Sequence, residues 1–360
     1  MFRFRGWLVL VLGGVAAAVV TAGGCAGDGA AIPDTPDAST AAPIDGATPP
    51  TTEADATADA AATSTVLASA GCETPGTLYP VGTTTVGTVA AGNVSRTFRV
   101  HVPPGYRPGA PVPVVLMIHG GGGSALQFET QSSEMDPIAD REGFIAVYPD
   151  GTGLIKTFNA GICCGRAQSD DIDDVGFIGK LLDHLEGQLC TDRKRVFASG
   201  MSNGGLFSHR LACELSARIA AVAPVAGTIG VTTCTPSRPV PVLHIHGTDD
   251  GHVPFDGGQG CGPDSAVFTS VPATMEGWRT RNGCTTGTSP YFQQGDGTCT
   301  AFGDCEAPTV LCTIADGGHS WPGGAPKSDA GSDCPGDGPQ STTFSASEVA
   351  WKFFQANPMP

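Results

Sequence analysis

Residue types that together carry out acyl transfer occur in this 360-residue chain in the order serine, aspartate, histidine. Ser202 stands in the segment 200–204, Gly-Met-Ser-Asn-Gly, which follows an apolar run and precedes a helix-like stretch. In a G-x-S-x-G turn of this kind the glycines avoid collisions with neighbouring backbone, so the serine hydroxyl is exposed at the tip. An ordinary serine-glycine turn is the alternative. We predict that Ser202 is a nucleophile and that the amide of Asn203 faces the oxyanion of an acyl-transfer intermediate.

A serine nucleophile needs a general base and an acidic group that orients the base. His319 lies past the last strand-like run, next to two glycines that would let its loop approach the serine. We predict that His319 is the base; a surface-loop histidine is the alternative. The acid is expected after the strand-like run 240–245, where Asp249 and Asp250 are adjacent. Spacing alone does not separate these two carboxylates.

Four consecutive glycines follow His119 at the end of the apolar run 114–118. Such a loop presents backbone N–H groups to an oxyanion, so we expect the second oxyanion donor here. A phosphate-binding loop is the alternative, but the lysine and hydroxyl residue that would complete it do not follow. Trp321, two residues after His319, is expected to form a flat wall for the substrate; the alternative is that it only packs its loop against the core.

The elements that would position these residues alternate between strand-like and helix-like runs, which indicates a mostly parallel sheet with helices on both faces. The segment 97–102 alternates at period two and is expected to be an antiparallel edge strand. Asp173 and Asp174 are expected to cap the helix that begins at Val175. The other strands are predicted at 114–118, 144–148, 196–198, 219–223, 240–245 and 310–314, and the helices at 132–140, 175–189, 206–211 and 348–354.

Six motifs follow one another along the folded part of the chain. They are His-Gly-Gly-Gly at 119–122, Phe-Asn-Ala-Gly with Cys-Cys-Gly at 158–165, Asp-Asp-Val-Gly-Phe at 173–177, Gly-Met-Ser-Asn-Gly-Gly at 200–205, His-Gly-Thr at 246–248 and Gly-His-Ser-Trp-Pro-Gly at 318–323. Together they resemble the feruloyl esterase and polyhydroxybutyrate depolymerase group, which is related to carbohydrate esterases of family one. The resemblance covers essentially all of the folded part and implies an α/β-hydrolase fold.

The same resemblance implies that Asp250 rather than Asp249 is the acid, and that Gly121 is the second oxyanion donor. The sequence departs from the family pattern at Phe158, where tryptophan is expected, and at Phe255, where tyrosine is common. Neither departure touches the three residues that would perform the chemistry.

The first 25 residues have the layout of a secretory signal, in which two arginines precede an apolar run and then small residues. Cys25 ends this stretch as in a bacterial lipobox, although Ala22 stands where leucine is usual. We therefore expect residues 1–25 to be a signal peptide with a lipidated Cys25; ordinary signal cleavage is the alternative. Residues 26–70 are expected to be a disordered tether, because they contain almost no large apolar residue. Residues 71–360 are expected to form the esterase domain.

Twelve cysteines follow Cys25, and an even, dense set behind a signal peptide indicates disulfides formed in an oxidising compartment. Their pairing cannot be deduced from the sequence. A zinc site is the alternative, but no pair of cysteines has ligand spacing. The net charge of −16, with no cluster of lysine and arginine, argues against nucleic acid as a partner.

These observations lead to one functional expectation: a secreted, lipid-anchored serine carboxylic ester hydrolase that works through an acyl-enzyme and needs no metal or cofactor. The favoured substrate is a feruloyl-type ester on plant cell-wall polysaccharide, and the alternative is a poly(3-hydroxybutyrate) polyester. A catalytically inactive binding lipoprotein is the alternative from a different class. Contact with a membrane is expected only through the N-terminal lipid.

Overall fold

The computed structural model describes residues 65–262, 266–325, 334 and 337–360. The predicted signal peptide with Cys25, and the predicted tether up to residue 64, lie outside the described residues. The last residues assigned to the tether already contact the folded part: the amide of Leu67 donates to Asp192 Oδ1 at 3.1 Å and that of Ser69 to the Thr191 carbonyl at 2.9 Å. Ordered contacts therefore begin a few residues before the predicted boundary at 71.

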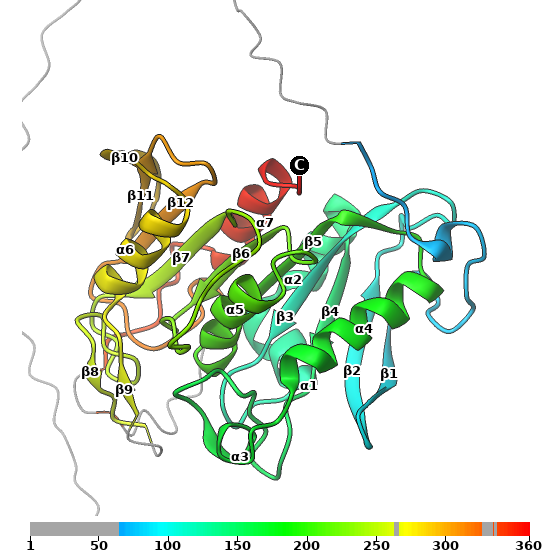
Figure 1. Cartoon of the computed structure of the whole chain (residues 1–360), viewed down its shortest axis with the longest axis horizontal. Helices are drawn as coiled ribbons and strands as arrows, with labels where there is room; N and C mark the ends of the chain where they lie inside the picture. The colour runs from blue at the N-terminus through cyan, green and yellow to red at the C-terminus, as the bar shows by residue number, and fades with distance from the viewer. Residues whose placement is uncertain (1–64, 263–265, 326–333, 335–336) are drawn as a thin grey trace, which may run out of the picture. The chain divides into compact units, whose positions relative to one another are not determined.

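A ten-stranded sheet runs through the domain in the order β1-β2-β4-β3-β5-β6-β7-β12-β11-β10 (Figure 1). Its six central strands are parallel, and antiparallel pairs flank them on both sides. The strands are β1 Thr83–Ala91, β2 Val94–Val102, β3 Val112–Ile118, β4 Ile145–Pro149, β5 Thr191–Met201, β6 Ala221–Val225, β7 Val242–Gly247, β10 Thr286–Gln294, β11 Gly297–Gly303 and β12 Thr309–Ile314. The short strands β8 Gly258–Gln259 and β9 Val267–Phe268 form a separate pair.

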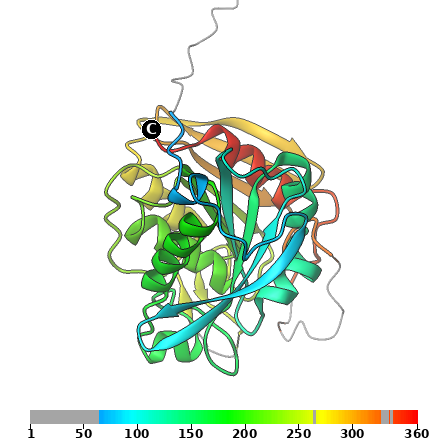
Figure 2. The ribbon, with the colours of Figure 1, turned by 90° about the vertical axis from the view of Figure 1, so that its right-hand side faces the viewer.

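Helices cover both faces of the sheet, as predicted. Along β3, Leu116 and Ile118 pack in one buried cluster with residues of α4, α5 and α6, whereas Val115 and Met117 pack in a second cluster with α2 and α7. Figure 1 shows α4, α5 and α6 in front of the sheet, and in Figure 2 α5 and α7 lie on opposite sides of it. The helical segments are α1 Ala125–Gln127, η2 Phe128–Ser133, α2 Met135–Glu142, α3 Gly165–Ser169, α4 Asp174–Gln188, α5 Asn203–Glu214, α6 Val271–Arg281 and α7 Ala346–Ala356, with the short turn η1 Ala70–Cys72 before β1. Burial on both faces explains why the central strands are continuous apolar runs.

Strand register brings the predicted site residues to one edge. Ile118 is paired with Gly200, Met201 with Val225, and Ile314 with Gly247, so the carboxyl ends of β3, β5, β6, β7 and β12 lie side by side. In open α/β sheets this is the edge at which ligands bind. The fold is therefore the predicted α/β-hydrolase type, with its candidate residues in the loops after these strands.

Three local predictions differ from the structure. The strand predicted at 97–102 is antiparallel, but β1 pairs with its outer side, so it is not the edge strand. Of the two adjacent aspartates, only Asp173 caps α4, accepting from the Gly176 amide at 2.7 Å. Asp174 is fully buried and forms an ion pair with Arg96 at 2.7 Å. Strands β10 and β11 and helix α6 were not predicted, because 286–303 has few large apolar residues and α6 is only weakly amphipathic.

All twelve cysteines after Cys25 are paired, which confirms the disulfide prediction. The pairs are Cys72–Cys190, Cys163–Cys164, Cys213–Cys234, Cys261–Cys334, Cys284–Cys305 and Cys299–Cys312. Within the described residues no helix combines the length and the apolar character that crossing a bilayer requires.

Candidate active site

Ser202 occupies a strained turn between β5 and α5. Its φ of 57° and ψ of −122° lie in a region that residues with a side chain rarely adopt. The flanking glycines permit this turn: a Cβ on Gly204 would lie 2.1 Å from the Ile118 carbonyl oxygen, and one on Gly200 would lie 2.6 Å from the same atom. The Ser202 amide donates to the Val225 carbonyl at 2.9 Å, which ties the turn to β6. The serine is therefore held at the predicted edge, partly exposed to solvent.

Asp250 and His319 meet in a buried hydrogen bond. His319 Nδ1 lies 2.8 Å from Asp250 Oδ2, and the residues are only 7% and 4% exposed. The carboxylate accepts, so Nδ1 carries the proton and Nε2 is left as the basic nitrogen. The other oxygen, Asp250 Oδ1, accepts from the amides of His252 at 2.9 Å and Val253 at 2.8 Å. Asp249, in contrast, is exposed.

The charge of Asp250 is stabilised by its partners. Burial alone would raise the pKa of this carboxyl, but the interactions with His319 and His246 outweigh that effect and lower its pKa far below the usual range. Asp250 is therefore an ionised acceptor that fixes the imidazole tautomer, whereas spacing alone had left Asp249 as an equal candidate.

A glycine lets the acid loop and the base loop approach each other. A Cβ on Gly247 would lie 2.1 Å from the Gly317 carbonyl oxygen. The backbone amide of Asp249 donates to that same carbonyl at 2.9 Å. On the far side, the His319 amide donates to Asp337 Oδ1 at 2.9 Å, and the His252 ring stacks on the His319 ring with centroids 4.6 Å apart. These contacts hold the His319 loop over the end of the sheet.

The two predicted oxyanion donors lie next to each other. A Cβ placed on Gly121 would be 3.9 Å from the Asn203 Cβ. Among the hydrogen bonds of the described residues, none uses the amide of Gly121 or of Asn203. The Asn203 side chain instead holds the neighbouring loop, accepting from the Phe158 amide at 2.7 Å and donating to the Phe158 carbonyl at 2.8 Å. Both amides are therefore available at the mouth of the Ser202 turn.

His119 orients one of these amides. The Gly151 amide donates to His119 Nε2 at 2.9 Å, so the ring proton is on Nδ1, which donates to the Gly120 carbonyl at 2.7 Å. Because a trans peptide is planar, fixing the Gly120 carbonyl fixes the Gly121 N–H in the opposite direction. Burial lowers the pKa of His119, which keeps the ring neutral for this arrangement. Phe158 is fully buried and packs against the His119 ring, with centroids 4.9 Å apart.

Trp321 is not an exposed wall of the site. Its side chain is 2% exposed, its indole Nε1 donates to Ser347 Oγ of α7 at 3.0 Å, and its ring meets Phe128 edge-on at 5.3 Å. These contacts belong to the core between the His319 loop, η2 and α7. The prediction that this indole faces the substrate is wrong, because the α7 partner draws it inward; its alternative, packing of the loop against the core, agrees with the structure.

The nucleophile follows β5 and the base follows β12, and the strands β6 and β7 lie between these two in the sheet. Among the described residues no hydrogen bond joins the Ser202 hydroxyl to His319. Catalytic hydrogen bonds are often long without substrate and shorten in the reacting complex. The structure thus brings Asp250 to His319 and Gly121 to Asn203, with Ser202 in the turn beside Asn203.

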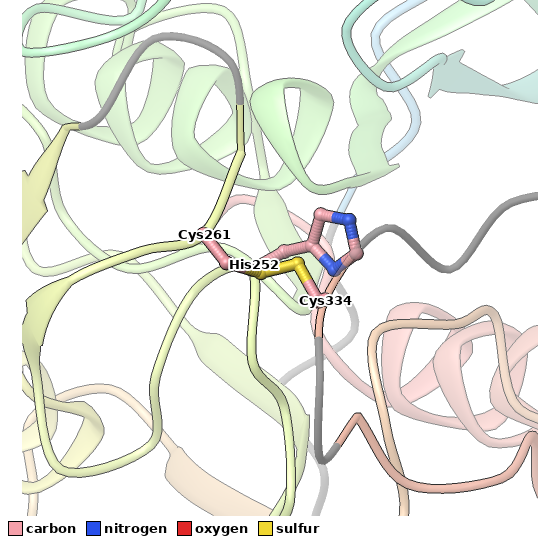
Figure 3. A group of neighbouring side chains, drawn as sticks. All are labelled: His252, Cys261 and Cys334. Atoms are coloured by element: carbon pink, nitrogen blue, oxygen red, sulfur yellow. A yellow bond between two sulfur atoms is a disulfide. The ribbon is translucent and has the colours of Figure 1, made fainter.

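Two groups of metal-ligand residue types occur at this edge, and neither donor set suits a resident ion. In the group His252, Cys261 and Cys334, the cysteines are joined in a disulfide (Figure 3), whereas metals bind the free thiolate. In the group Asp250, His252 and His319, the carboxylate and the Nδ1 proton of His319 are already engaged with each other. Protonated Nδ1 offers no lone pair to a metal.

An exposed apolar side chain beside the oxyanion loop, that of Ile155, was not anticipated from the sequence. Ile155 Cγ2 would lie 3.7 Å from a Cβ on Gly122, and the Gly122 amide donates to the Lys156 carbonyl at 2.8 Å. Leu154, Ile155 and Ile162 are all exposed. The apolar pair Leu154-Ile155 directly after a Pro-Asp-Gly-Thr-Gly turn was the available sequence signal, since such a loop is usually polar.

The chain is similar in sequence to known esterases. A family model described as esterase PHB depolymerase matches residues 96–237. Feruloyl esterase B of Piromyces equi is 32% identical over 237 residues, which cover 61% of this chain and only 42% of that protein. The putative esterase NocK of Nocardia uniformis subsp. tsuyamanensis is 32% identical over 263 residues, 67% of this chain and 75% of that protein.

Among solved structures, the acetyl xylan esterase from Aspergillus awamori aligns with a TM-score of 0.48 and 14% identity, covering 66% of this chain and 94% of that one. The match to the family model includes the strand β5 and the turn that carries Ser202. The chain belongs to the esterase family of feruloyl esterases and polyhydroxybutyrate depolymerases, which are carboxylic ester hydrolases.

Proposed function

We propose that this chain is a serine carboxylic ester hydrolase in which Ser202, His319 and Asp250 act in sequence. Ser202 Oγ attacks the ester carbonyl while His319 Nε2 takes the hydroxyl proton and Asp250 holds the resulting imidazolium. The amides of Asn203 and Gly121 bind the oxyanion. His319 returns the proton to the departing alcohol, leaving an acyl group on Ser202. A water that gives its proton to His319 then releases the carboxylic acid and restores the serine.

The observation that carries this proposal is the buried Asp250–His319 pair at the same sheet edge as the strained Ser202 turn. Hydrolysis of p-nitrophenyl acetate, with Ser202→Ala as the matched control, is the test. A fluorophosphonate probe should add its mass to the wild-type protein and not to the Ser202→Ala variant. No hydrolysis and no labelling would favour the inactive binding lipoprotein instead.

For the substrate we propose a feruloyl-type ester on polysaccharide. Support comes from the Piromyces relative, a feruloyl esterase by name, and from the exposed apolar side chain of Ile155, which lies against Gly122 of the oxyanion loop. An aromatic acyl group would cover this side chain, whereas an acetyl group is too short to do so. With Trp321 buried, we assign to Ile155 the apolar contact that the sequence had assigned to the indole.

A direct comparison of esters tests the acyl group. We expect methyl ferulate to be hydrolysed with a higher kcat/KM than hydroxybutyrate oligomers. Ile155→Ser should raise KM for methyl ferulate by about threefold or more, from the loss of buried apolar area. The same variant should leave p-nitrophenyl acetate nearly unaffected. A poly(3-hydroxybutyrate) depolymerase is the second candidate, favoured by the family model that matches residues 96–237; preferential hydrolysis of the oligomers would select it.

Export with a lipid on Cys25 is a further part of the proposal. Its support is the layout of residues 1–25 and the polar, small-residue composition that follows. The Cys25→Ser variant should release active enzyme into the medium, since the anchor would be lost. If the variant fractionates with membranes as the wild type does, Cys25 is not an anchor.

A further inference from the structure

A continuous row of hydrogen-bonded rings runs through the core from α6 to Asp250. Trp278 Nε1 donates to His209 Nδ1 at 2.9 Å, and His209 Nε2 lies 3.1 Å from His244 Nδ1. His244 Nε2 lies 3.0 Å from His246 Nδ1. His246 Nε2 then lies 2.8 Å from the Val253 carbonyl and 3.3 Å from Asp250 Oδ2. The row thus joins α6, α5 and β7 to the carboxylate that holds His319.

The two ends of the row determine where every proton lies. An indole N–H is a donor only, so His209 Nδ1 accepts and the His209 proton is on Nε2. His209 therefore donates to His244, and His244 in turn donates to His246. At the other end, a carbonyl and a carboxylate accept only, which agrees with a proton on His246 Nε2. All three rings are neutral, and all their N–H groups point toward Asp250.

The surroundings favour this neutral state. The four side chains are buried, and the histidine rings stack with centroids 5.3 and 5.2 Å apart. Burial lowers the pKa of His209 to about 3, although a hydrogen bond to the Gly227 backbone acts in the opposite direction. Burial also lowers the pKa of His244 well below its usual value. The charged group facing the far end is Arg281, whose guanidinium lies 5.5 Å from the Trp278 ring centre. A cation there disfavours an extra proton on the row.

We propose that Trp278, His209, His244 and His246 are positioning residues that present one fixed N–H to Asp250 and so set the protonation behaviour of His319. The proposal rests on the function proposed above. None of the four touches the reacting atoms. The row moves no net proton, because Trp278 cannot accept one at its far end. The N–H of His246 is bonded to the Val253 carbonyl at 2.8 Å, and the row keeps this N–H 3.3 Å from the same oxygen, Oδ2, that accepts from His319.

Removing that donor has a predictable sign. A carboxylate oxygen with one donor fewer keeps more negative charge and holds the proton on His319 more strongly. His319 then stays protonated to higher pH, where it cannot act as a base. The other groups facing His319 are the stacked ring of His252 and the carboxylate of Asp337, and neither is changed by a substitution in the row.

The test compares two substitutions at one position. A glutamine at 246 can accept from His244 and donate toward Asp250 and Val253, as the imidazole does, whereas a leucine fills similar space and can do neither. We expect His246→Leu to move the acid limb of the kcat/KM profile to higher pH and to lower kcat/KM at pH 7 by about 2- to 10-fold, the equivalent of one hydrogen bond. His246→Gln should keep the wild-type limb. The positioning role would be overturned if both variants lose activity and the acid limb of the kcat/KM profile of His246→Leu does not move.

Nitrogen-15 NMR of the wild-type domain provides a readout that does not depend on activity or on the folding of a variant. At pH 8, His209, His244 and His246 should each carry one proton, on Nε2. His209 and His244, whose pKa values are lowered by burial, should remain neutral down to pH 5. A proton on Nδ1 of any of them would overturn the direction of the row. If the wild type shows these tautomers but hydrolyses no ester, the proposed function fails while the row stands. If the enzyme is active but shows other tautomers, the row fails while the proposed function stands.

Discussion

At the scale of single residues, Asp250 differs from Asp249 by its surroundings and not by its chemistry. Asp250 is buried and accepts from two backbone amides and from His319, whereas Asp249 is exposed and uses its backbone to tie two loops together. The local sequence presents the same side chain twice. Only the turn after β7 directs one of them inward.

Substitution of the two aspartates should therefore have unequal effects. We expect Asp250→Ala to lower kcat on p-nitrophenyl acetate by about 10⁴-fold, the loss typical when the orienting acid of a serine triad is removed. Asp249→Ala should change kcat by less than about threefold, as for an exposed group. Circular dichroism of both variants serves as the folding control. Severe loss in Asp249→Ala with an active Asp250→Ala would reverse the assignment of the acid.

His119 acts on the reaction through the Gly120–Gly121 peptide. His119→Leu removes the shorter of two hydrogen bonds to the Gly120 carbonyl and leaves the one from the Gly123 amide at 3.1 Å, so the Gly121 N–H should be held less firmly. Loss of an oxyanion donor costs about 10²- to 10³-fold in kcat, and a misoriented donor should cost somewhat less, about 10- to 100-fold. KM should change little. His184→Leu is a matched control. His184 Nε2 lies 2.7 Å from the Tyr79 hydroxyl, away from the site, so this variant should leave kcat unchanged.

At the scale of elements, buried polar pairs connect the strands to the helices that carry the site. The Arg96–Asp174 ion pair joins β2 to the start of α4, and Asp174 Oδ2 also accepts from the Asn159 amide at 2.7 Å. The guanidinium lies 4.0 Å from the centre of the Phe177 ring. The start of the loop that begins at Phe158 is thereby held from two sides, by Asp174 at Asn159 and by Asn203 at Phe158.

The buried histidines between α5 and β7 make the fold sensitive to acid. In the unfolded chain His209 and His244 take up protons below about pH 6.5. In the folded state burial lowers the pKa of both rings, to about 3 for His209, so they stay neutral at pH values where the unfolded chain is protonated. The unfolded state then binds more protons, so the free energy of unfolding falls as the pH falls through this window. Each ring should contribute up to about 1.4 kcal/mol per pH unit.

Urea unfolding between pH 7 and pH 4 measures this slope. His209→Gln can keep both neighbouring hydrogen bonds but cannot take up a proton, so its slope should be smaller than that of the wild type by close to one proton. The partly buried His184 offers the comparison variant His184→Gln. An unchanged slope in His209→Gln would show that His209 is already protonated in the folded domain.

At the scale of the whole domain, six disulfides close loops of very different lengths, from 1 to 118 residues of sequence separation. Cys72–Cys190 closes a separation of 118 residues and joins η1 to the end of α4, whereas Cys163–Cys164 closes none. Cys261–Cys334 lies beside His252, close to the base (Figure 3). These cross-links act on the unfolded chain according to the length of the loop that each one closes.

Removing the two extreme disulfides should give unequal losses. The variant Cys72→Ser/Cys190→Ser frees a long loop, worth roughly 4–5 kcal/mol in chain entropy, and should lower the melting temperature by about 10 °C. The variant Cys163→Ser/Cys164→Ser frees no loop and should cost much less. Mass spectrometry under non-reducing conditions should find no free thiol among the twelve cysteines of the wild type. Equal shifts in the two variants would contradict the loop-length explanation.

The sequence by itself determined the α/β architecture, the six central strands and the places of Ser202 and His319. Those features are local: a buried parallel strand is a continuous apolar run, and a tight turn between a strand and a helix requires glycine on both sides of the serine. Strand ends of a parallel sheet meet at one edge, so chain order was sufficient to bring the candidate residues into one region.

Only the tertiary structure decided which side chains those residues meet. The inward turn of Trp321, the Cys72–Cys190 disulfide and the bonds that join Trp278, His209 and His244 depend on contacts between residues 26 to 118 positions apart. The Asp250–His319 bond is also long-range; the family resemblance had implied it, whereas spacing alone had not. Side chains of one type are equivalent in a sequence, and packing makes them different by burying one and leaving the other in water. The strands β10 and β11 were missed for the same reason, since the pairing of β10 with β11 and of β11 with β12 compensates for a weak local pattern.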